Sequence, residues 1–339
     1  MIELSICIPS YNRFHVLKRN ILSILTKTKS MDFEVVIIDN QSPKDVIQTL
    51  DITDKRLRII KRNVPVSGTE NVNQCVLYAR GKYALLCLDK DYIDGGYLDD
   101  FISCLKNHND IKGGICPVFS KKNGHLLQKF TNRVIEKKTD LLIHFGYTKK
   151  HPSGNFYLTE CVKRAYQYSL SEEEKKNTYG ADYLLAECAV CGPMLLYDKP
   201  MVFQESDSES IAIKSYSLSA QKNNLYFEPN VISKQLLQDF SHLKKLPCRR
   251  IEYYKTIWHL YRIALNAVTV DYKQVMQNAS LCAHYRVPTK NVSKKEMRYW
   301  IRYLNNTFLS YRGLDIGIKY FLFIAINSGF WIEKGKYII

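Results

Sequence analysis

Two carboxylates separated by one residue, Asp89 and Asp91, carry the clearest chemistry in this sequence. They follow the apolar run 83–88, which predicts a buried strand. Ligands of open α/β sheets bind beyond the carboxyl ends of the strands, so both carboxylates are expected at a ligand-binding edge. Carboxylate oxygens hold divalent cations, and a bound cation can neutralise a diphosphate. The Asp-Lys-Asp tripeptide therefore predicts a site for a nucleoside diphosphate and a metal ion.

The elements that must position these residues alternate between strands and helices over the first 120 residues. The apolar spacing predicts strands at 4–9, 33–38, 56–61 and 83–88, and helices at 14–26 and 68–80. Strands that alternate with helices at this spacing imply a parallel sheet with right-handed crossovers. The continuous apolar strands agree, because both faces of such a sheet are covered.

After Asp91 the pattern is looser. It predicts a helix at 97–105, a strand at 115–119 and a hairpin at 121–138. A turn cluster at 151–155 predicts a loop over the site. Two helices follow, one capped by Ser171 and Glu174 and one from Asp182 to about Cys191. Beyond Pro229 only helices are predicted, at 231–246, 251–267, 272–284, 294–309 and 314–332. We therefore expect an α/β catalytic domain at 1–228 and a helical region at 229–339 that serves acceptor, membrane or oligomer contacts.

The composition restricts the class of protein. The chain has 339 residues, and its ten cysteines are scattered, several of them inside apolar runs, which suits reduced thiols in a cytosol. The pair Cys188 and Cys191 has no second pair, so we expect no zinc site. Met1 leads directly into a strand without a signal peptide, and the apolar run near the C-terminus is shorter than the ~18–20 residues of a membrane span. A cytoplasmic protein is expected.

The positive charge is concentrated in the last third of the chain. The net charge is +16, and residues 241–339 hold 17 Lys and Arg against 5 Asp and Glu. Basic residues alternate with aromatic ones there, as in 298–303. Such a face suits nucleic acid, an anionic lipid surface or an acidic polymer. A solvated helical surface is the alternative interpretation.

Three segments carry a resemblance to a known family: Ser5–Arg13 (SICIPSYNR), Val35–Ser42 (VVIIDNQS) and Ala79–Asp91 (ARGKYALLCLDKD). In this order and at these spacings they resemble the successive motifs of family 2 glycosyltransferases. The resemblance is strong to about residue 120 and loose to about 240. It implies the GT-A fold, a Rossmann-like, mostly parallel sheet flanked by helices.

The resemblance also assigns residues to a nucleotide-sugar site. It implies that Pro9, Tyr11 and Asn12 line the nucleotide pocket, that Asp39 binds the uracil or ribose, that Asn73 lies near the nucleotide, that Asp89 contacts the ribose and that Asp91 binds Mn²⁺ or Mg²⁺. From the residue types themselves, Tyr11 can lie against a base and Arg13 offers donors to phosphate. The alternatives are rim packing for Tyr11, a surface charge for Arg13 and a cap with Ser42 for Asp39.

The phosphates have two further candidate partners. Gly68 opens a helix whose amide end can face them. Val72 stands where the family usually has an arginine before the asparagine, so Arg13 or Lys90 would have to compensate the diphosphate charge. The metal ligands expected are Asp91 and Asp89, since the tripeptide places both at the end of the strand.

An inverting transfer also needs a base that takes the proton of the acceptor hydroxyl. The family carries an aspartate for this purpose 90 to 100 residues after the metal motif, and Asp182 is the best match, with Glu187 as the runner-up. Alanine replaces the glutamate that usually precedes the aspartate, and Asp182 can instead be an acid favoured at a helix start. His151 can meet the acceptor or the metal, but a lone loop histidine is more often neither, so we leave it out of the metal shell.

These observations predict a non-processive, inverting, metal-dependent glycosyltransferase that moves a sugar from a UDP-sugar to a glycan, with a lipid-linked surface polysaccharide as the expected acceptor. It would work in the cytoplasm, at the inner face of the cell membrane where it contacts anionic lipid, and its C-terminal helices can form an oligomer. The rival is a polyanion- or nucleic-acid-binding protein on an inactive nucleotide-binding fold. The rival has no recognisable readout motif and leaves Asp89 and Asp91 without a role, so no nucleic acid is expected.

Overall fold

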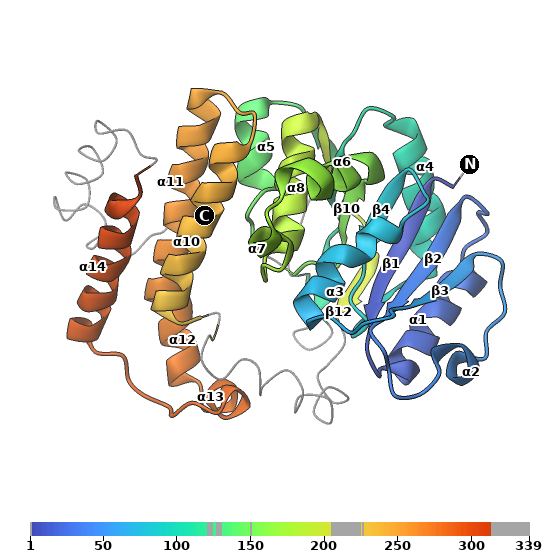
Figure 1. Cartoon of the computed structure of the whole chain (residues 1–339), viewed down its shortest axis with the longest axis horizontal. Helices are drawn as coiled ribbons and strands as arrows, with labels where there is room; N and C mark the ends of the chain where they lie inside the picture. The colour runs from blue at the N-terminus through green and yellow to red at the C-terminus, as the bar shows by residue number, and fades with distance from the viewer. Residues whose placement is uncertain are drawn as a thin grey trace. The chain divides into compact units, whose positions relative to one another are not determined.

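The computed structural model (Figure 1) describes residues 2–120, 125–126, 131–149, 151–204, 225 and 227–312. The chain divides into two compact units. The first comprises residues 1–217 with 246–252, and the second comprises 218–245 with 253–339. No helix among the described residues is long and apolar enough to cross a membrane.

The first unit contains the predicted parallel sheet. Its first four strands are β1 (Leu4–Ser10), β2 (Phe33–Asp39), β3 (Leu57–Lys61) and β4 (Tyr83–Leu86), in the order β3-β2-β1-β4. All three pairings are parallel, and the register sets Ser10 of β1 beside Asp39 of β2. The carboxyl ends of these strands therefore meet at one edge, as the sequence predicts.

The sheet continues past β4 with strands of mixed direction: β10 (Asn155–Leu158), β6 (Gly113–Ile115), β11 (Met194–Leu196) and β9 (Arg133–Ile135). Among the described residues, β10 runs antiparallel between β4 and β6. A second sheet consists of β5 (Asp91–Ile93), β12 (Val202–Gln204), β7 (Val118–Ser120) and β8 (His125–Leu126).

Two sequence predictions in this region were wrong in detail. The single strand predicted at 115–119 is broken between β6 and β7, which belong to different sheets, and Pro117 lies at the break because it has no N–H for a ladder. Of the hairpin predicted at 121–138, residues 121–124 and 127–130 lie outside the described residues. The described strands β8 and β9 pair with β7 and β11, not with each other.

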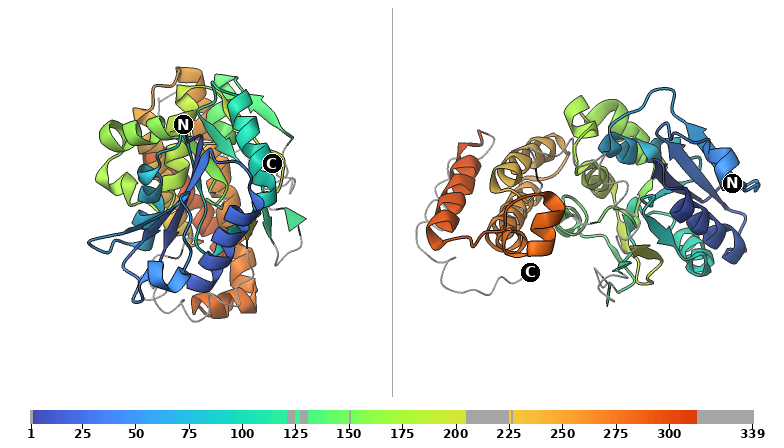
Figure 2. Two further views of the ribbon diagram at one scale, coloured as in Figure 1. Left: turned by 90° about the vertical axis from the view of Figure 1, so that its right-hand side faces the viewer. Right: turned by 90° about the horizontal axis from the view of Figure 1, so that it is seen from below.

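Helices cover both faces of the large sheet, as Figure 2 shows from the side. One face carries α1 (Phe14–Lys27), α2 (Val46–Leu50) and α4 (Leu98–Asn107). The other carries α3 (Gly68–Cys75), α6 (Thr159–Arg164) and α8 (Gly180–Cys191). The shorter helices of this unit are η1 (Val76–Tyr78), η2 (Gly95–Tyr97), α5 (Lys138–His144), η3 (Ala165–Ser169) and α7 (Glu172–Lys175). Ser171 and Glu174 form the predicted capping box of α7.

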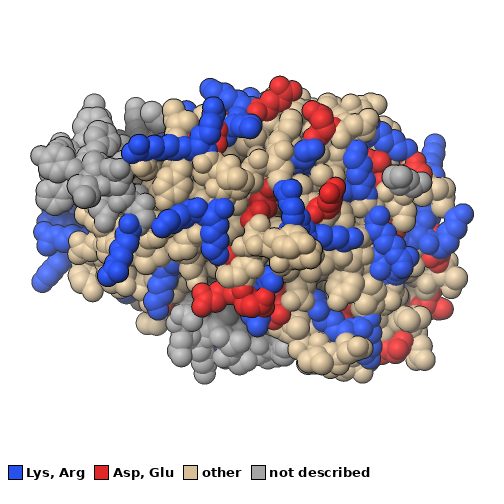
Figure 3. Space-filling view, turned by 45° about the horizontal axis from the view of Figure 1, so that its top comes forward, with Lys and Arg blue, Asp and Glu red and all other residues tan. Residues whose placement is uncertain are grey.

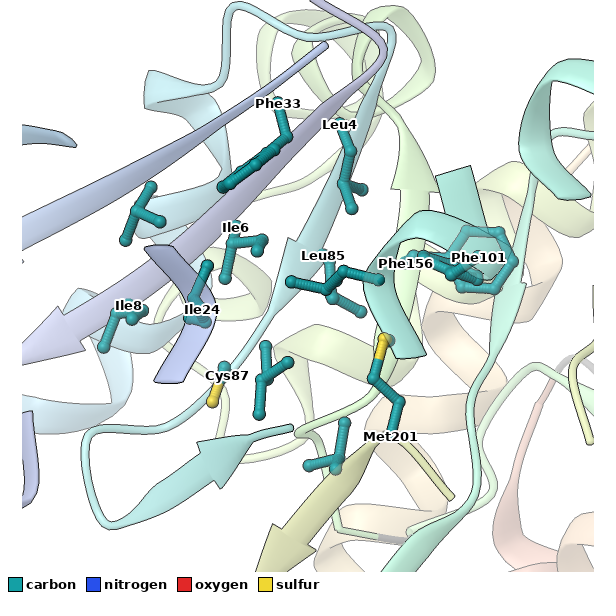
Figure 4. Close-up of a cluster of buried hydrophobic side chains, with 14 of the residues drawn as sticks. Leu4, Ile6, Ile8, Ile24, Phe33, Leu85, Cys87, Phe101, Phe156 and Met201 are labelled. Atoms are coloured by element: carbon teal, nitrogen blue, oxygen red, sulfur yellow. The ribbon is translucent and has the colours of Figure 1, made fainter. Parts of the chain in front are cut away.

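The core lies between the sheet and helices α1, α2 and α4. Strand periodicity of two sends Leu4, Ile6 and Ile8 of β1 to this side, where they are fully buried with Ile24 and Phe101 (Figure 4). The intervening strand residues face α3 and α8. Because helices bury both faces of the sheet, polar side chains that bind a ligand can lie only at the ends of its strands.

The second unit is helical in its described part. Its helices are α10 (Pro229–Lys245), α11 (Arg250–Asn266), η5 (Ala267–Asp271), α12 (Tyr272–Gln277), α13 (Ala279–Tyr285) and α14 (Lys294–Ser310). The helix predicted at 272–284 is two helices, because Asn278 leaves the helical conformation and caps α13 through its side chain. The helix predicted at 314–332 lies outside the described residues.

Candidate functional site

The loops that follow β1 and β2 are tied together at the carboxyl edge of the sheet. Asp39, the last residue of β2, is fully buried, and both of its oxygens accept the backbone N–H of Ser42 while Ser42 Oγ donates to Oδ1. The backbone N of Asn12 donates in turn to Ser42 Oγ over 2.8 Å. Asn12 has a left-handed φ of 54°, which asparagine tolerates. Asp39 thus caps its own turn, which is the alternative interpretation of this residue.

Asp89 ties the loop after β4 to the loop after β1. Its Oδ2 accepts the backbone N–H of Tyr11 over 3.1 Å, and its Oδ1 lies 3.5 Å from Nε of Arg13. Burial raises the pKa of Asp89 to about 6, although Arg13 and the Tyr11 amide act in the opposite direction. The structure therefore brings Tyr11, Arg13 and Asp89 together at this edge. Pro9 is buried within β1, and Lys90 is half-buried in the turn after Asp89.

Asp91 begins β5 and is fully buried. Its Oδ2 lies 2.5 Å from Nε2 of His151 and accepts a hydrogen bond of 2.5 Å from Oγ of Ser153. Its Oδ1 has no hydrogen-bond partner within the described part of the chain. A buried carboxylate oxygen without a partner is costly, so this atom marks the point where a ligand can complete the site.

The sequence analysis left His151 out of the metal shell and did not single out Ser153, and both contact Asp91 in the structure. Ser153 is fully buried, and its Oγ also accepts the backbone N–H of Leu88, so it fixes Asp91 to the end of β4. The His151 side chain is 14% exposed and covers Asp91. The turn cluster at 151–155 was visible in the sequence. It was expected as a loop over the site, but its contacts with Asp91 were not predicted, because they depend on the pairing of β10 with β4.

Asp182 lies in the first turn of α8 and holds the segment that leads to His151. Its Oδ2 accepts the backbone N–H of Lys149 over 2.6 Å, and Thr148 Oγ1 lies 3.5 Å from its Oδ1. The side chain is buried, with 3% of its surface exposed. The predicted base is thus bound to a loop in this structure. Glu187 lies five residues later, about 140° further around the helix, and faces Arg164.

Asn73, which was expected near the nucleotide, has its side-chain amide engaged by the chain itself. It is 2% exposed, and its amide donates to the carbonyl oxygens of Lys175 over 3.0 Å and Asn177 over 2.8 Å. It therefore ties α3 to the segment before α8. Gly68 opens α3 after the N-cap Ser67, and a Cβ at Gly68 would meet no atom within 4 Å. The space in front of this helix end is open.

The side chains at this edge fit a divalent cation that takes some of its ligands from the protein and the rest from a substrate. The described residues contain no group of three or more His, Cys, Asp or Glu side chains able to hold a metal alone. Asp91 Oδ1 is one donor, and His151 would be a second where the cation replaces the contact between its Nε2 and Asp91 Oδ2. Mn²⁺ or Mg²⁺ takes its remaining oxygens from phosphates and water. Asp89 is engaged with Tyr11 and Arg13, so Asp91 is the carboxylate with an oxygen to offer.

The mostly parallel sheet flanked by helices is a fold of the GT-A type. Residues 5–163 match the model of glycosyl transferase family 2, and this range includes every predicted site residue except Asp182 and Glu187. Residues 5–163 therefore form a glycosyl transferase family 2 domain, which makes up a little under half of the chain.

Solved structures agree on the fold. The chain is similar to Staphylococcus aureus TarS 1-349 in complex with UDP, with a TM-score of 0.58 and 13% identity, over 100% of this chain and 93% of that one. The same protein in complex with UDP-GlcNAc gives a TM-score of 0.55 and 15% identity, over 91% of this chain and 81% of that one. No curated protein matches the sequence.

Proposed function

We propose that the protein is an inverting, metal-dependent glycosyltransferase that moves a hexosyl group from a UDP-sugar to a glycan acceptor. The observation that carries the proposal is the buried Asp91 carboxylate, whose Oδ1 is open beside His151 at the carboxyl end of β4. UDP is favoured because the TarS structures of the same fold contain UDP or UDP-GlcNAc. A diphosphate also supplies the oxygens that the cation would lack.

Asp91 and His151 would hold the Mn²⁺ or Mg²⁺ ion, which when bound neutralises the charge that develops on the leaving diphosphate. Arg13, 21% exposed in its side chain and held near Asp89, supplies a second positive charge at the same edge. Tyr11 presents its ring from the loop that Asp89 fixes. Arg13 and the ion would together supply the positive charge that the family obtains from an arginine at the position of Val72.

The base assignment stays a prediction, with Asp182 first and Glu187 as the runner-up. To accept a proton from the acceptor, Asp182 would have to turn one of its oxygens to the hydroxyl; Oδ2 is held by Lys149, and Oδ1 lies 3.5 Å from Thr148 Oγ1. Glu187 is buried on another side of α8, facing Arg164, and is the weaker candidate. NMR of the product formed from an α-linked donor tests inversion, because a retained anomer would contradict a single displacement.

The acceptor and the membrane contact are assigned to the helical region 229–339. Basic and aromatic side chains share one exposed face of α14 at helical spacing, and Tyr299 is 59% exposed: Lys295, Arg298, Tyr299, Arg302 and Tyr303. Tyrosine and arginine suit the headgroup zone of an anionic membrane, where each basic residue contributes about 1 kcal/mol. Figure 3 shows Lys and Arg spread over a whole face of the molecule, so the aromatic residues distinguish α14 more than charge does. This face is proposed to contact anionic lipid beside a lipid-linked polysaccharide acceptor. An oligomer through these helices is the alternative.

Titration of UDP into the protein by calorimetry, with and without Mn²⁺, tests the donor site. Binding that needs both the cation and Asp91 supports the proposal, and Asp91→Ala is the variant that must lose it. Glu160→Ala, an exposed carboxylate in the same unit, is the matched control. Binding of RNA or another polyanion that Asp91→Ala leaves intact, without any UDP binding, would favour the rival on an inactive fold.

Liposome co-sedimentation tests the membrane contact separately. The full chain should pellet with anionic vesicles, and the triple change Arg298→Gln, Tyr299→Ser, Arg302→Gln should weaken the effect. Vesicles of neutral lipid are the control, since binding to them would contradict an electrostatic contact. Gel filtration of the same variant shows whether the face is instead used for an oligomer.

A further inference from the structure

One loop connects two aspartates that belong to different elements. Lys149 N donates to Asp182 Oδ2 of α8 over 2.6 Å, and two residues later His151 Nε2 lies 2.5 Å from Asp91 Oδ2. Ser153, two residues further on, reaches the same oxygen. The candidate base and the candidate cation ligand are therefore held by the same short segment of backbone.

The backbone around this segment is strained, so contacts with other parts of the chain are needed to hold it in this conformation. Tyr147 and Lys149 have left-handed φ values of 58° and 53°, which cost of order 1 kcal/mol or more for such residues. Gly154 has a φ of 92°, and a Cβ there would lie 2.7 Å from the carbonyl oxygen of Cys116. The carboxylate of Asp182 compensates the strain at Lys149 with a charge-assisted hydrogen bond.

The distance along the chain makes the connection tight. Two residues span at most about 7 Å, so a displacement of Lys149 moves His151 with it. Ser153 fixes the far end of the segment to β4 through the Leu88 amide, and Asp182 holds the near end at the Lys149 amide. The position of the imidazole at Asp91 is thus set from both sides.

We propose that Asp182 is a positioning residue for the cation site: it holds Thr148 and Lys149 so that His151, two residues further along the chain, stands beside the Asp91 carboxylate. The inference rests on the proposed function in one respect, that Asp91 and His151 bind the cation. It does not depend on whether Asp182 is also the base. By linkage, a cation held by His151 stabilises the hydrogen bond from Lys149 to Asp182.

The first experiment measures Mn²⁺ binding to the nucleotide-free full chain, from the electron paramagnetic resonance signal of free Mn²⁺. Asp182→Ala removes the acceptor and should weaken Mn²⁺ binding about ten- to a hundredfold, the range for residues that orient a metal ligand. Asp182→Asn keeps an acceptor oxygen for Lys149 and should restore most of the affinity. Glu173→Ala, an exposed carboxylate of α7, is the control for charge loss and should bind as the wild type does.

The outcomes separate this inference from the proposed function. If the wild type and Asp91→Ala bind Mn²⁺ equally, the proposed function fails. If binding needs Asp91 but Asp182→Ala matches the wild type, the positioning role is overturned. The thermal unfolding of each variant shows whether it is folded when its affinity is measured.

A second measurement needs no variant. Hydrogen exchange of the Lys149 amide in the wild type should slow when Mn²⁺ saturates the site, because that amide is the donor to Asp182. An unchanged exchange rate at saturation would contradict the connection between the loop and the cation.

Discussion

Each end of the parallel sheet has a buried carboxylate, and the two carboxylates differ in how many hydrogen-bond partners the protein gives them. At the amino end of β2, Glu34 accepts Ser5 Oγ over 2.6 Å, Arg58 Nε over 3.1 Å and the backbone N of Arg80 over 2.9 Å. At the carboxyl end of β4, Asp91 has both of its partners on one oxygen and none on the other. Both side chains are removed from water, but only Glu34 is satisfied by the chain itself.

The difference separates structure from function within one sheet. Burial disfavours the charged form of Glu34, but the hydrogen bonds from Arg58, Ser5 and Arg80 outweigh it and lower its pKa. This network stabilises the fold and has no capacity left for a ligand. Asp91 is left incomplete, and the fold tolerates it because Ser153 and His151 hold its other oxygen.

The largest expected effect is that of Asp91→Asn on catalysis. The amide keeps an acceptor for Ser153 but gives up the charge that a cation needs, so turnover should fall by at least about a hundredfold. The free energy of unfolding in cation-free buffer should change by less than about 1 kcal/mol. Steady-state rates and urea denaturation measure the two quantities. A large loss of stability with turnover retained would mean that Asp91 serves the fold and not the function.

Glu34→Ala should give the opposite result. Removing one partner of a largely buried ion pair leaves Arg58 and Ser5 uncompensated, and we expect a loss of about 3 kcal/mol in the free energy of unfolding. Turnover per folded molecule should be unchanged. Urea denaturation gives the first number, with the exposed Glu160→Ala as the control. Equal stability of both variants would mean that the network at the amino end contributes nothing.

The same residue predicts a pH dependence. The pKa of Glu34 in the folded protein lies below its ordinary value of 4.5, so folding favours the charged form. Its stabilisation is therefore complete above pH 4.5 and is lost as the pH falls through the lower folded pKa. The difference in unfolding free energy between wild type and Glu34→Gln should shrink in that acidic window. A difference that stays constant down to the folded pKa would contradict the sign of the shift.

A smaller effect is expected at the carboxyl edge, where protein groups satisfy Asp39. Ser42→Ala removes the hydroxyl that links Asn12 to Asp39 and should cost about 1–2 kcal/mol of stability. If the two loops shape the nucleotide pocket, UDP affinity should fall as well, while Mn²⁺ binding at Asp91 is retained. Calorimetry on the same preparation provides both values, and Ser42→Thr, which keeps the hydroxyl, is the conservative control.

The smallest effect is expected for Gly68→Ala. A Cβ there meets nothing within 4 Å, and alanine should stabilise the start of α3 by about 0.5 kcal/mol. Asn73→Ala is the contrast, because it leaves the carbonyls of Lys175 and Asn177 without their donor. If Gly68→Ala weakens UDP binding while stability rises, the phosphates approach this helix end as the sequence predicts. Unchanged affinity removes Gly68 from the site.

Local patterns were enough for the parts of the molecule that depend on local physics. Apolar runs predicted β1 to β4 within a few residues, because a strand covered on both faces must be continuously apolar. The capping box at Ser171 was predicted for a similar reason, since its partners are three residues apart. Asp89 and Asp91 were expected at a strand end; Asp89 lies in the turn after β4, and Asp91 begins β5. The two aspartates nevertheless have different partners, which their shared motif does not indicate.

The sequence by itself determined the parallel sheet, the polar edge where its strands end and the match of residues 5–163 to a glycosyltransferase family. Tertiary structure alone decided which side chains meet at that edge. Ser153 and His151 reach Asp91 because β10 pairs antiparallel with β4, some 70 residues apart in the chain. Asp182 reaches Lys149 because α8 packs against β10, the strand that follows Lys149 in the chain. Such contacts are formed by long-range pairing, and no local spacing of residue types encodes them.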